Sequence, residues 1–239
     1  MYRYIGWDYP LNKTASLVDA QPLGLAARKI LCCAEQLIAE HGLEGVSTRM
    51  ISRASGQKNN SALQYHFKNR EGLIEAILDY RVTPVNQQRL LRLQHLKSQS
   101  RLPSTRKLVE VFIEPFASEL LKPIEDTYYV SLLAQLYAYQ AGRELFAKNK
   151  VRARALHDIT SLLIKTLAPL PVRVIHLRLQ LMGRQTVSSV AEWDEARRKH
   201  IIELDSEALQ WRTRNLIDFM VAGLQAPSTD SARHGTHER

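Results

Sequence analysis

The chain has 239 residues, 45% of them hydrophobic and 24% charged, an ordinary balance for a protein with a packed core. Lys and Arg exceed Asp and Glu by 33 to 24, and the resulting net charge of +9 favours a polyanionic partner without proving one. The two cysteines, Cys32 and Cys33, are neighbours, and no apolar run approaches the roughly 20 residues of a membrane span. This excludes a disulfide framework and a transmembrane helix. The N-terminus also lacks the apolar core of a signal peptide, so we expect a cytoplasmic protein.

Apolar residues recur at helical spacing almost throughout, and strand-like alternation does not persist, so the sequence predicts an all-α fold. Residues 1–23 show no periodicity and are expected to form an arm. Residues 24–41 carry one apolar helical stripe, which Gly42 should end.

Two short helices are expected next. Ser47 is a suitable N-cap for a helix through Ser55, and Gly56 follows where a left-handed residue is needed. A third helix is expected over about 60–67, with Leu63 and Phe67 on its inward face.

A fourth helix should start near Arg70. Longer helical patterns follow, with expected breaks at Pro84, 102–103, near Pro123 and at 168–171. Pro115 should kink or interrupt the pattern that contains it. The expected helices cover 86–98, 104–122, 126–147, 150–167, 171–199 and 204–225. The polar tail, 226–239, is expected to be disordered.

Two short helices joined at a glycine and preceded by a longer helix have the arrangement of a helix-turn-helix. Residues 34–56 (AEQLIAEHGLEGVSTRMISRASG) and 63–78 (LQYHFKNREGLIEAIL) carry the specific pattern. On these motifs, residues 24–80 resemble the DNA-binding domain of TetR/AcrR-family transcriptional regulators. The basic charge agrees, because residues 24–70 hold seven Lys and Arg against three acidic residues, a net +4.

The sequence departs from the family's usual pattern in the turn between the short helices. The turn is one residue longer, so Asn59 falls at the usual serine N-cap position, a chemically equivalent role. Gln64 replaces the common tyrosine, and Tyr65 takes the variable position. Base preferences of the family therefore do not transfer directly to this chain.

The resemblance implies a role for each matching position. Residues at the start of the second helix would meet the DNA backbone or a nearby base, the third helix would face the groove, and basic groups after it would hold phosphates. A solvated helix face is the alternative, and His66 could simply cap or pack. The implied DNA-binding residues are Ser47, Thr48, Arg49, Asn60, Ser61, Ala62, Gln64, Tyr65, His66, Lys68 and Arg70.

The resemblance also implies a domain order: arm 1–23, helix-turn-helix domain 24–70, and ligand-binding and dimerisation domain 71–225. The last two long helices, about 171–199 and 204–225, would form a homodimer on a palindromic double-stranded DNA operator. A small-molecule inducer would bind the larger domain, and the connector 70–98 would act as a lever. Pro84 either helps to define that lever or marks a helix boundary.

The inducer site is predicted from aromatic residues, whose hydroxyls could orient a ligand. An ordinary core role is the alternative for them, and an exposed or interface role is the alternative for the arginine. The candidate ligand-binding residues are Phe112, Phe116, Tyr128, Tyr129, Leu133, Tyr137 and Arg178.

No nucleophile–base motif, phosphate-binding glycine loop or zinc-ligand spacing is present in the sequence, so no enzyme, cofactor or metal site is predicted. The favoured function is a ligand-responsive repressor, with an activator or a constitutive regulator left open. The alternative is a helical small-molecule-binding or interaction protein that does not read DNA, and the longer turn is the feature that favours it.

Overall fold

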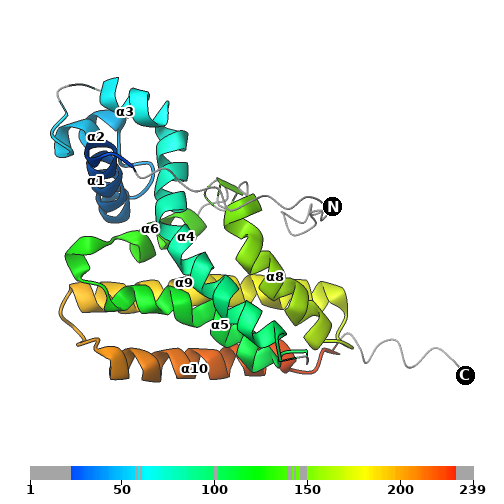
Figure 1. The fold of residues 1–239 in the computed structure, drawn as a ribbon. Coiled ribbons are helices and arrows are strands. Elements are labelled where there is room, and N and C mark those ends of the chain that lie inside the picture. Colours follow the sequence, from blue (N-terminus) through cyan, green and yellow to red (C-terminus); the bar gives the residue numbers. More distant parts are fainter. Residues whose placement is uncertain are drawn as a thin grey trace, which may run out of the picture. The chain divides into compact units, whose positions relative to one another are not determined.

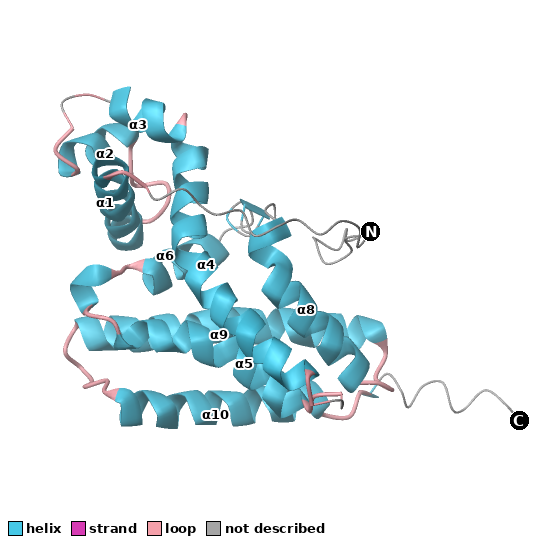
Figure 2. Cartoon of the chain, viewed as in Figure 1, coloured by secondary structure: helices cyan, strands magenta, loops and turns pink. Residues whose placement is uncertain are grey.

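The computed structural model describes residues 23–57, 59, 61–99, 102–138, 142, 144–145 and 150–229. Every regular element within these residues is a helix, which confirms the predicted all-α fold (Figure 2). The elements are α1 (Leu25–His41), α2 (Thr48–Ala54), α3 (Ser61–Phe67), α4 (Arg70–Lys97), α5 (Thr105–Ala117), the 3-10 helices η1 (Ser118–Leu121) and η2 (Ile124–Asp126), α6 (Tyr129–Ala138), α8 (Lys150–Thr166), α9 (Val172–Arg198) and α10 (Ser206–Gln225). Nearly all of the expected arm and most of the expected tail lie outside the described residues.

The chain divides into two compact units, each built from two separate stretches of the sequence. The first unit combines the described residues up to Val85 with those of 122–154, and the second combines 86–121 with those from 155 onward. Within the first unit, α6 packs against α1 (Figure 1). A helix expected to belong to the ligand-binding region therefore shares a unit with the helix-turn-helix.

The core of the first unit is built around α1, which contacts α2 and α3 as well as α6. Leu63 and Phe67 of α3 lie inward, as the spacing predicts, because residues four apart share one helix face. Truncating one such side chain to alanine costs about 2–5 kcal/mol. The buried apolar residues between α1 and the first part of α4 include Ala27, Ile30, Leu31, Ala34, Ile38, Val46, Ile51, Leu63, Phe67, Leu73 and Ile77.

The expected break at Pro84 is wrong, because α4 runs without interruption from Arg70 to Lys97. Proline removes one amide donor and crowds the preceding turn, which is tolerated where the ring has room. Pro84 is exposed, while Val82 and Val85 on either side of it are buried. Burial of these neighbours supports the helix through the proline.

Helix α5 contains Pro115 near its C-terminal end and continues into η1. Pro115 cannot donate to the carbonyl of Val111, and its ring disturbs the turn before it. The next carbonyl, that of Phe112, accepts two hydrogen bonds from Arg89 of α4, from Nε at 3.1 Å and from Nη2 at 2.8 Å. A buried guanidinium thus supplies donors where the proline weakens the helix.

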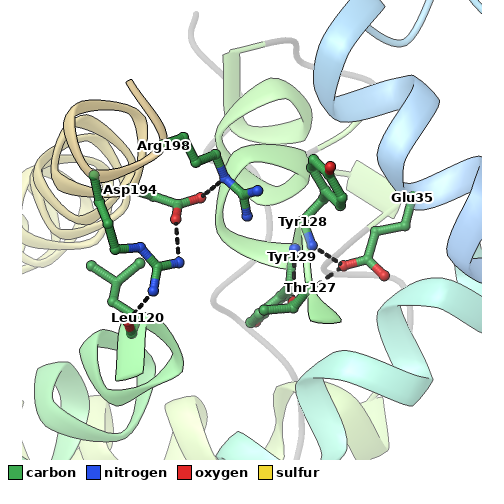
Figure 3. A network of polar contacts seen from close by, with 8 residues as sticks. Glu35, Leu120, Thr127, Tyr128, Tyr129, Asp194 and Arg198 are labelled. Atoms are coloured by element: carbon green, nitrogen blue, oxygen red, sulfur yellow. Dashed lines mark hydrogen bonds and ion pairs between the residues drawn. The ribbon is translucent and has the colours of Figure 1, made fainter. Parts of the chain in front are cut away.

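In the second unit, α10 packs against α5 and α9. Asp194 of α9 accepts hydrogen bonds from Arg197 at 2.8 Å and from Arg198 at 3.0 Å (Figure 3). Arg197 also donates to the carbonyl of Leu120 in η1. This charged cluster fixes the short 3-10 helix to the C-terminal part of α9.

The helix expected over 126–147 begins later, at Tyr129, after the separate turn η2. Thr127 stands between the two elements, and its hydroxyl accepts from the amide of Tyr129 at 3.1 Å. This hydroxyl satisfies one of the donors that a helix start leaves open. Much of the expected C-terminal half of the helix falls on residues outside the described part.

Candidate nucleic-acid interface

Local hydrogen bonds define α2 and the turn after it. The hydroxyl of Ser47 accepts from the amide of Met50 at 3.2 Å, which confirms the predicted N-cap. At the other end, Ser55 donates its hydroxyl to the carbonyl of Ile51 at 2.8 Å. Gly56 follows with φ +72°, a left-handed conformation that favours glycine and turns the chain toward α3.

The start of α3 is capped by Asn59, whose side-chain oxygen accepts from the amide of Ser61 at 3.1 Å. This confirms the capping role predicted for Asn59 in the longer turn. The insertion therefore leaves the start of the third helix intact. Lys58 and Asn60 lie outside the described residues, and so does the DNA contact predicted for Asn60.

The outward face of α3 is polar. Ser61, Gln64, Tyr65 and His66 are exposed, and Tyr65 keeps 85% of its surface accessible. The rings of Tyr65 and His66 meet edge to face, with centroids 5.0 Å apart. Neither Gln64 nor Tyr65 forms a side-chain hydrogen bond to another described residue, so their polar groups stay available to a partner. Ala62 is half-buried beside this face.

Basic side chains are exposed on the elements before and after α3. Arg49 in α2 and Lys68 after α3 are exposed, and Lys68 adopts φ +64° where the chain leaves the helix. The ammonium of Lys29 lies beside the turn, 3.4 Å from the position that a Cβ would take at Gly56. No role was predicted for Lys29, because only folding brings α1 next to this turn.

The turn from α3 into α4 places Arg70 at the first position of α4. Asn69 caps this helix by accepting from the amide of Gly72 at 2.8 Å. Gly72 fits here because a Cβ would stand 2.2 Å from the carbonyl oxygen of Phe67. The Nε and Nη2 atoms of Arg70 are buried and have no hydrogen-bond partner among the described residues.

The predicted ligand-binding residues fall in both units. Tyr128, Tyr129, Leu133 and Tyr137 belong to the first, whereas Phe112, Phe116 and Arg178 belong to the second. Tyr128 and Tyr137 are half-buried, and the other apolar members are buried.

Arg178 has a structural role that needs no ligand. Its guanidinium donates to the carbonyls of Leu224 at 2.9 Å, Ala226 at 2.5 Å and Pro227 at 3.2 Å, at the C-terminal end of α10. Cations are favoured at this end of a helix. The ligand role of Arg178 stays a prediction, as do those of Phe112 and Phe116.

The part of the chain that the structure describes lacks two kinds of feature. No group of three or more His, Cys, Asp or Glu side chains there is arranged to hold a metal ion. No helix there is long and apolar enough to cross a membrane. Cys32 and Cys33 are free, and burial raises the pKa of both thiols, which lowers the fraction of reactive thiolate.

Comparison with known proteins links this geometry to a family. Residues 30–77 match the family model of bacterial regulatory proteins of the tetR family. A search of curated protein sequences finds no match.

Solved structures share the fold at low identity. The fatty acid degradation regulator FadR from Bacillus halodurans is 18% identical, covers 86% of this chain with 99% of its own, and has a TM-score of 0.55. A TetR family transcription regulator from Marinobacter aquaeolei VT8 is 18% identical, with coverages of 81% and 94% and a TM-score of 0.50. A putative tetR family transcription regulator from Shewanella sp. PV-4 is 17% identical, with coverages of 82% and 98% and a TM-score of 0.52. Residues 30–77 therefore match the N-terminal helix-turn-helix region of tetR-family regulators, and the chain as a whole shares its fold with solved structures of such regulators.

Proposed function

We propose that the protein is a ligand-responsive transcriptional repressor that binds a palindromic operator as a homodimer in the cytoplasm. The observation that carries the proposal is the outward face of α3, where Gln64 and Tyr65 are exposed beside a packed helix-turn-helix core. A glutamine amide can pair with an adenine edge in the major groove. The nearby Ser61 hydroxyl can donate to or accept from either kind of base pair.

Phosphate contacts are proposed for the groups around this face. Arg49 in α2, Lys68 after α3 and Arg70 at the start of α4 supply positive charge, and phosphate contacts fix the register of a protein on DNA. Arg70 is half-buried, and its place in this set rests on the match of residues 63–78 to the family's pattern. The proposed DNA-binding set remains Ser47, Thr48, Arg49, Asn60, Ser61, Ala62, Gln64, Tyr65, His66, Lys68 and Arg70.

Dimerisation is proposed through α9 and α10, which expose large apolar side chains. Leu177 and Leu181 of α9, with Trp211 and Phe219 of α10, each keep more than half of their surface accessible. A second copy that packs these helices as a four-helix bundle would bury this surface. A two-fold dimer then presents two copies of α3 to successive major grooves, about 34–36 Å apart on a palindromic site.

The inducer is proposed to act on α6, which contains Tyr129, Leu133 and Tyr137 and is directly preceded by Tyr128. All four residues lie in the same unit as the helix-turn-helix. A ligand changes DNA affinity only as far as it binds one state of the protein, competent or incompetent for DNA binding, more tightly than the other. A ligand that prefers a displaced α6 would therefore favour the state that releases DNA.

A gel-shift titration against the DNA that flanks its own gene tests the function. Sequence-specific binding that weakens steeply with salt is expected, because each phosphate contact releases counterions. Weak binding that is indifferent to sequence would instead support the alternative, a helical ligand-binding or interaction protein that does not read DNA.

A further inference from the structure

Glu35 is a buried carboxylate on α1, only 1% exposed, at a position that the DNA-binding face does not use. The other buried residues of α1 are apolar, among them Leu31, Ala34 and Ile38. An ionised carboxylate without partners is strongly unfavourable in such surroundings. The neighbouring elements of the first unit must therefore compensate for its burial.

Arg81 of α4 provides one part of this compensation. Its Nε donates to Oε2 of Glu35 at 2.8 Å, and its Nη2 lies 2.7 Å from the same oxygen. The Nη2 atom also donates to the carbonyl of Asp126 in η2 at 2.9 Å, and the guanidinium lies 5.1 Å from the ring centroid of Tyr80. Arg81 thus links α1 to the segment that leads into α6.

The second carboxylate oxygen of Glu35 holds the start of α6 directly. Oε1 accepts from the amide of Tyr128 at 2.9 Å and from the hydroxyl of Thr127 at 3.4 Å (Figure 3). Thr127 in turn accepts from the amide of Tyr129, the first residue of α6. A helix start leaves amide donors unsatisfied and favours negative charge. Glu35 therefore acts as a cap for α6, although it lies 93 positions earlier in the chain.

We infer that Glu35 is a positioning residue that fixes the helix-turn-helix domain to the start of α6. α1 packs against α2 and α3 and also against α6, so a displacement at Tyr128 and Tyr129 is passed to the DNA-binding helices through α1. These two tyrosines are also candidate inducer contacts. The consequence for DNA binding rests on the proposed function, whereas the capping of α6 rests on the contacts alone.

The chemistry of the carboxyl agrees with a contact that responds to movement. Burial raises the pKa of Glu35, although Arg81 and the hydrogen bonds from Tyr128 and Thr127 oppose this effect. Separation of α6 from α1 would rehydrate the carboxylate, which stabilises its charged form. The closed contact and the opened contact therefore differ in hydration as well as in position.

The test compares Glu35→Gln and Thr127→Val with the wild type in the full-length protein. Glutamine keeps an acceptor for the Tyr128 amide but loses the ion pair with Arg81, and valine removes only the bridging hydroxyl. Glu40→Gln is the matched control, since Glu40 lies exposed on the same helix and accepts a hydrogen bond from Gln36 within α1. Amide hydrogen exchange is followed over residues 127–133, and affinity is measured on a duplex that the wild type selects from random sequences.

In Glu35→Gln we expect amide exchange at the start of α6 to be about tenfold faster or more, because the variant loses a hydrogen bond to a charged group. A smaller increase is expected in Thr127→Val, and none in Glu40→Gln. In Glu35→Gln and Thr127→Val, affinity should fall by the same factor for all DNA sequences. The amides of α2 and α3 should stay protected from exchange in both variants. Unchanged exchange at 127–133, or loosened α6 with wild-type DNA affinity, would overturn the inference.

The two arms also separate this inference from the proposed function. If the wild type selects no DNA sequence, the proposed function fails, and the exchange measurement still decides whether Glu35 caps α6. If Glu35→Gln does not fold, both the exchange measurement and the DNA-binding measurement are made on Thr127→Val. This variant should fold, because valine is close to threonine in shape and removes a single hydroxyl.

Discussion

Two polar regions of the first unit differ in their exposure to solvent. On α3, Gln64 and Tyr65 are exposed and make no side-chain hydrogen bond to other described residues. On the α6 side of α1, Glu35 is buried and each of its oxygens has a partner. An exposed polar group costs little when unpaired, whereas a buried one is expensive unless its partners are fixed. The first region is therefore suited to read a partner, and the second to hold the protein's own geometry.

The largest effect is expected from Arg81→Ala, which leaves the Glu35 carboxylate buried without its cation. Breaking a buried ion pair by removing one partner costs about 3–5 kcal/mol of unfolding free energy. Scanning calorimetry should show a clearly lower Tm. In contrast, Gln64→Ala should change stability by no more than about 0.5 kcal/mol, because the side chain is exposed.

Arg92→Ala is the matched control, since Arg92 pairs with Glu114 on the surface and both side chains are more than 40% exposed. Such pairs contribute at most about 1 kcal/mol. Equal losses of stability in Arg81→Ala and Arg92→Ala would remove the distinction between buried and exposed polar groups.

When DNA binding is measured instead of stability, the exposed region on α3 should be the more sensitive of the two to mutation. Gln64→Ala should cost about 1–3 kcal/mol of binding free energy at one base pair and relax specificity there. Competition binding with a set of single-base operator variants would show which position has lost its discrimination.

Arg70→Ala provides the contrast within the same interface. A phosphate contact carries no sequence information, so its loss should weaken all sequences alike and reduce the slope of affinity against salt. If both variants bind the selected operator as tightly as wild type, the assignment of these residues to the interface is wrong.

The sequence predicted the exposed region well because its signals are local. Helical periodicity placed Leu63 and Phe67 inward, and capping and turn preferences identified Ser47, Gly56 and Asn59. The family match then located the helix-turn-helix. The specific DNA contacts remain predictions, since their partner is DNA.

The contacts of the buried region around Glu35 could not be predicted from the sequence, because they join residues that are far apart in the chain. Glu35 looked like an ordinary acidic residue on α1, and its partners Arg81, Thr127 and Tyr128 are scattered along the sequence. Pro84 was predicted to break a helix because local propensity omits the packing of Val82 and Val85 around it. Only tertiary contacts join α6 to the helix-turn-helix in one unit.

Asn59 tests a third kind of polar group, exposed but used for local structure. Asn59→Ala removes the acceptor for the Ser61 amide and should cost about 1 kcal/mol of unfolding free energy. Urea unfolding would measure the loss. A neutral result would show that the longer turn holds α3 without this cap, and the adjacent readout by Gln64 would then not depend on it.

The smallest expected effect is a pH dependence at Glu35. Burial raises the pKa of this carboxyl in the folded state, so the folded protein keeps the proton to a higher pH than the unfolded chain does. The stabilisation that comes from this difference in pKa is therefore fully present below the pKa of Glu35 in the unfolded chain, about 4.3. It is lost as the pH rises through the higher pKa of Glu35 in the folded protein. Urea midpoints of wild type and Glu35→Gln, measured from mildly acidic to neutral pH, isolate this group because the variant lacks it.

We expect the difference in stability between wild type and Glu35→Gln to be most favourable to wild type at the acidic end and to shrink toward neutral pH. The direction follows from desolvation, the largest influence on Glu35, outweighing the attraction of Arg81. A difference that grows with pH would mean that the ion pair dominates, and that Arg81 stabilises the charged form by more than burial destabilises it. The buried region would then hold its geometry through charge, and not mainly through the hydrogen bonds to the start of α6.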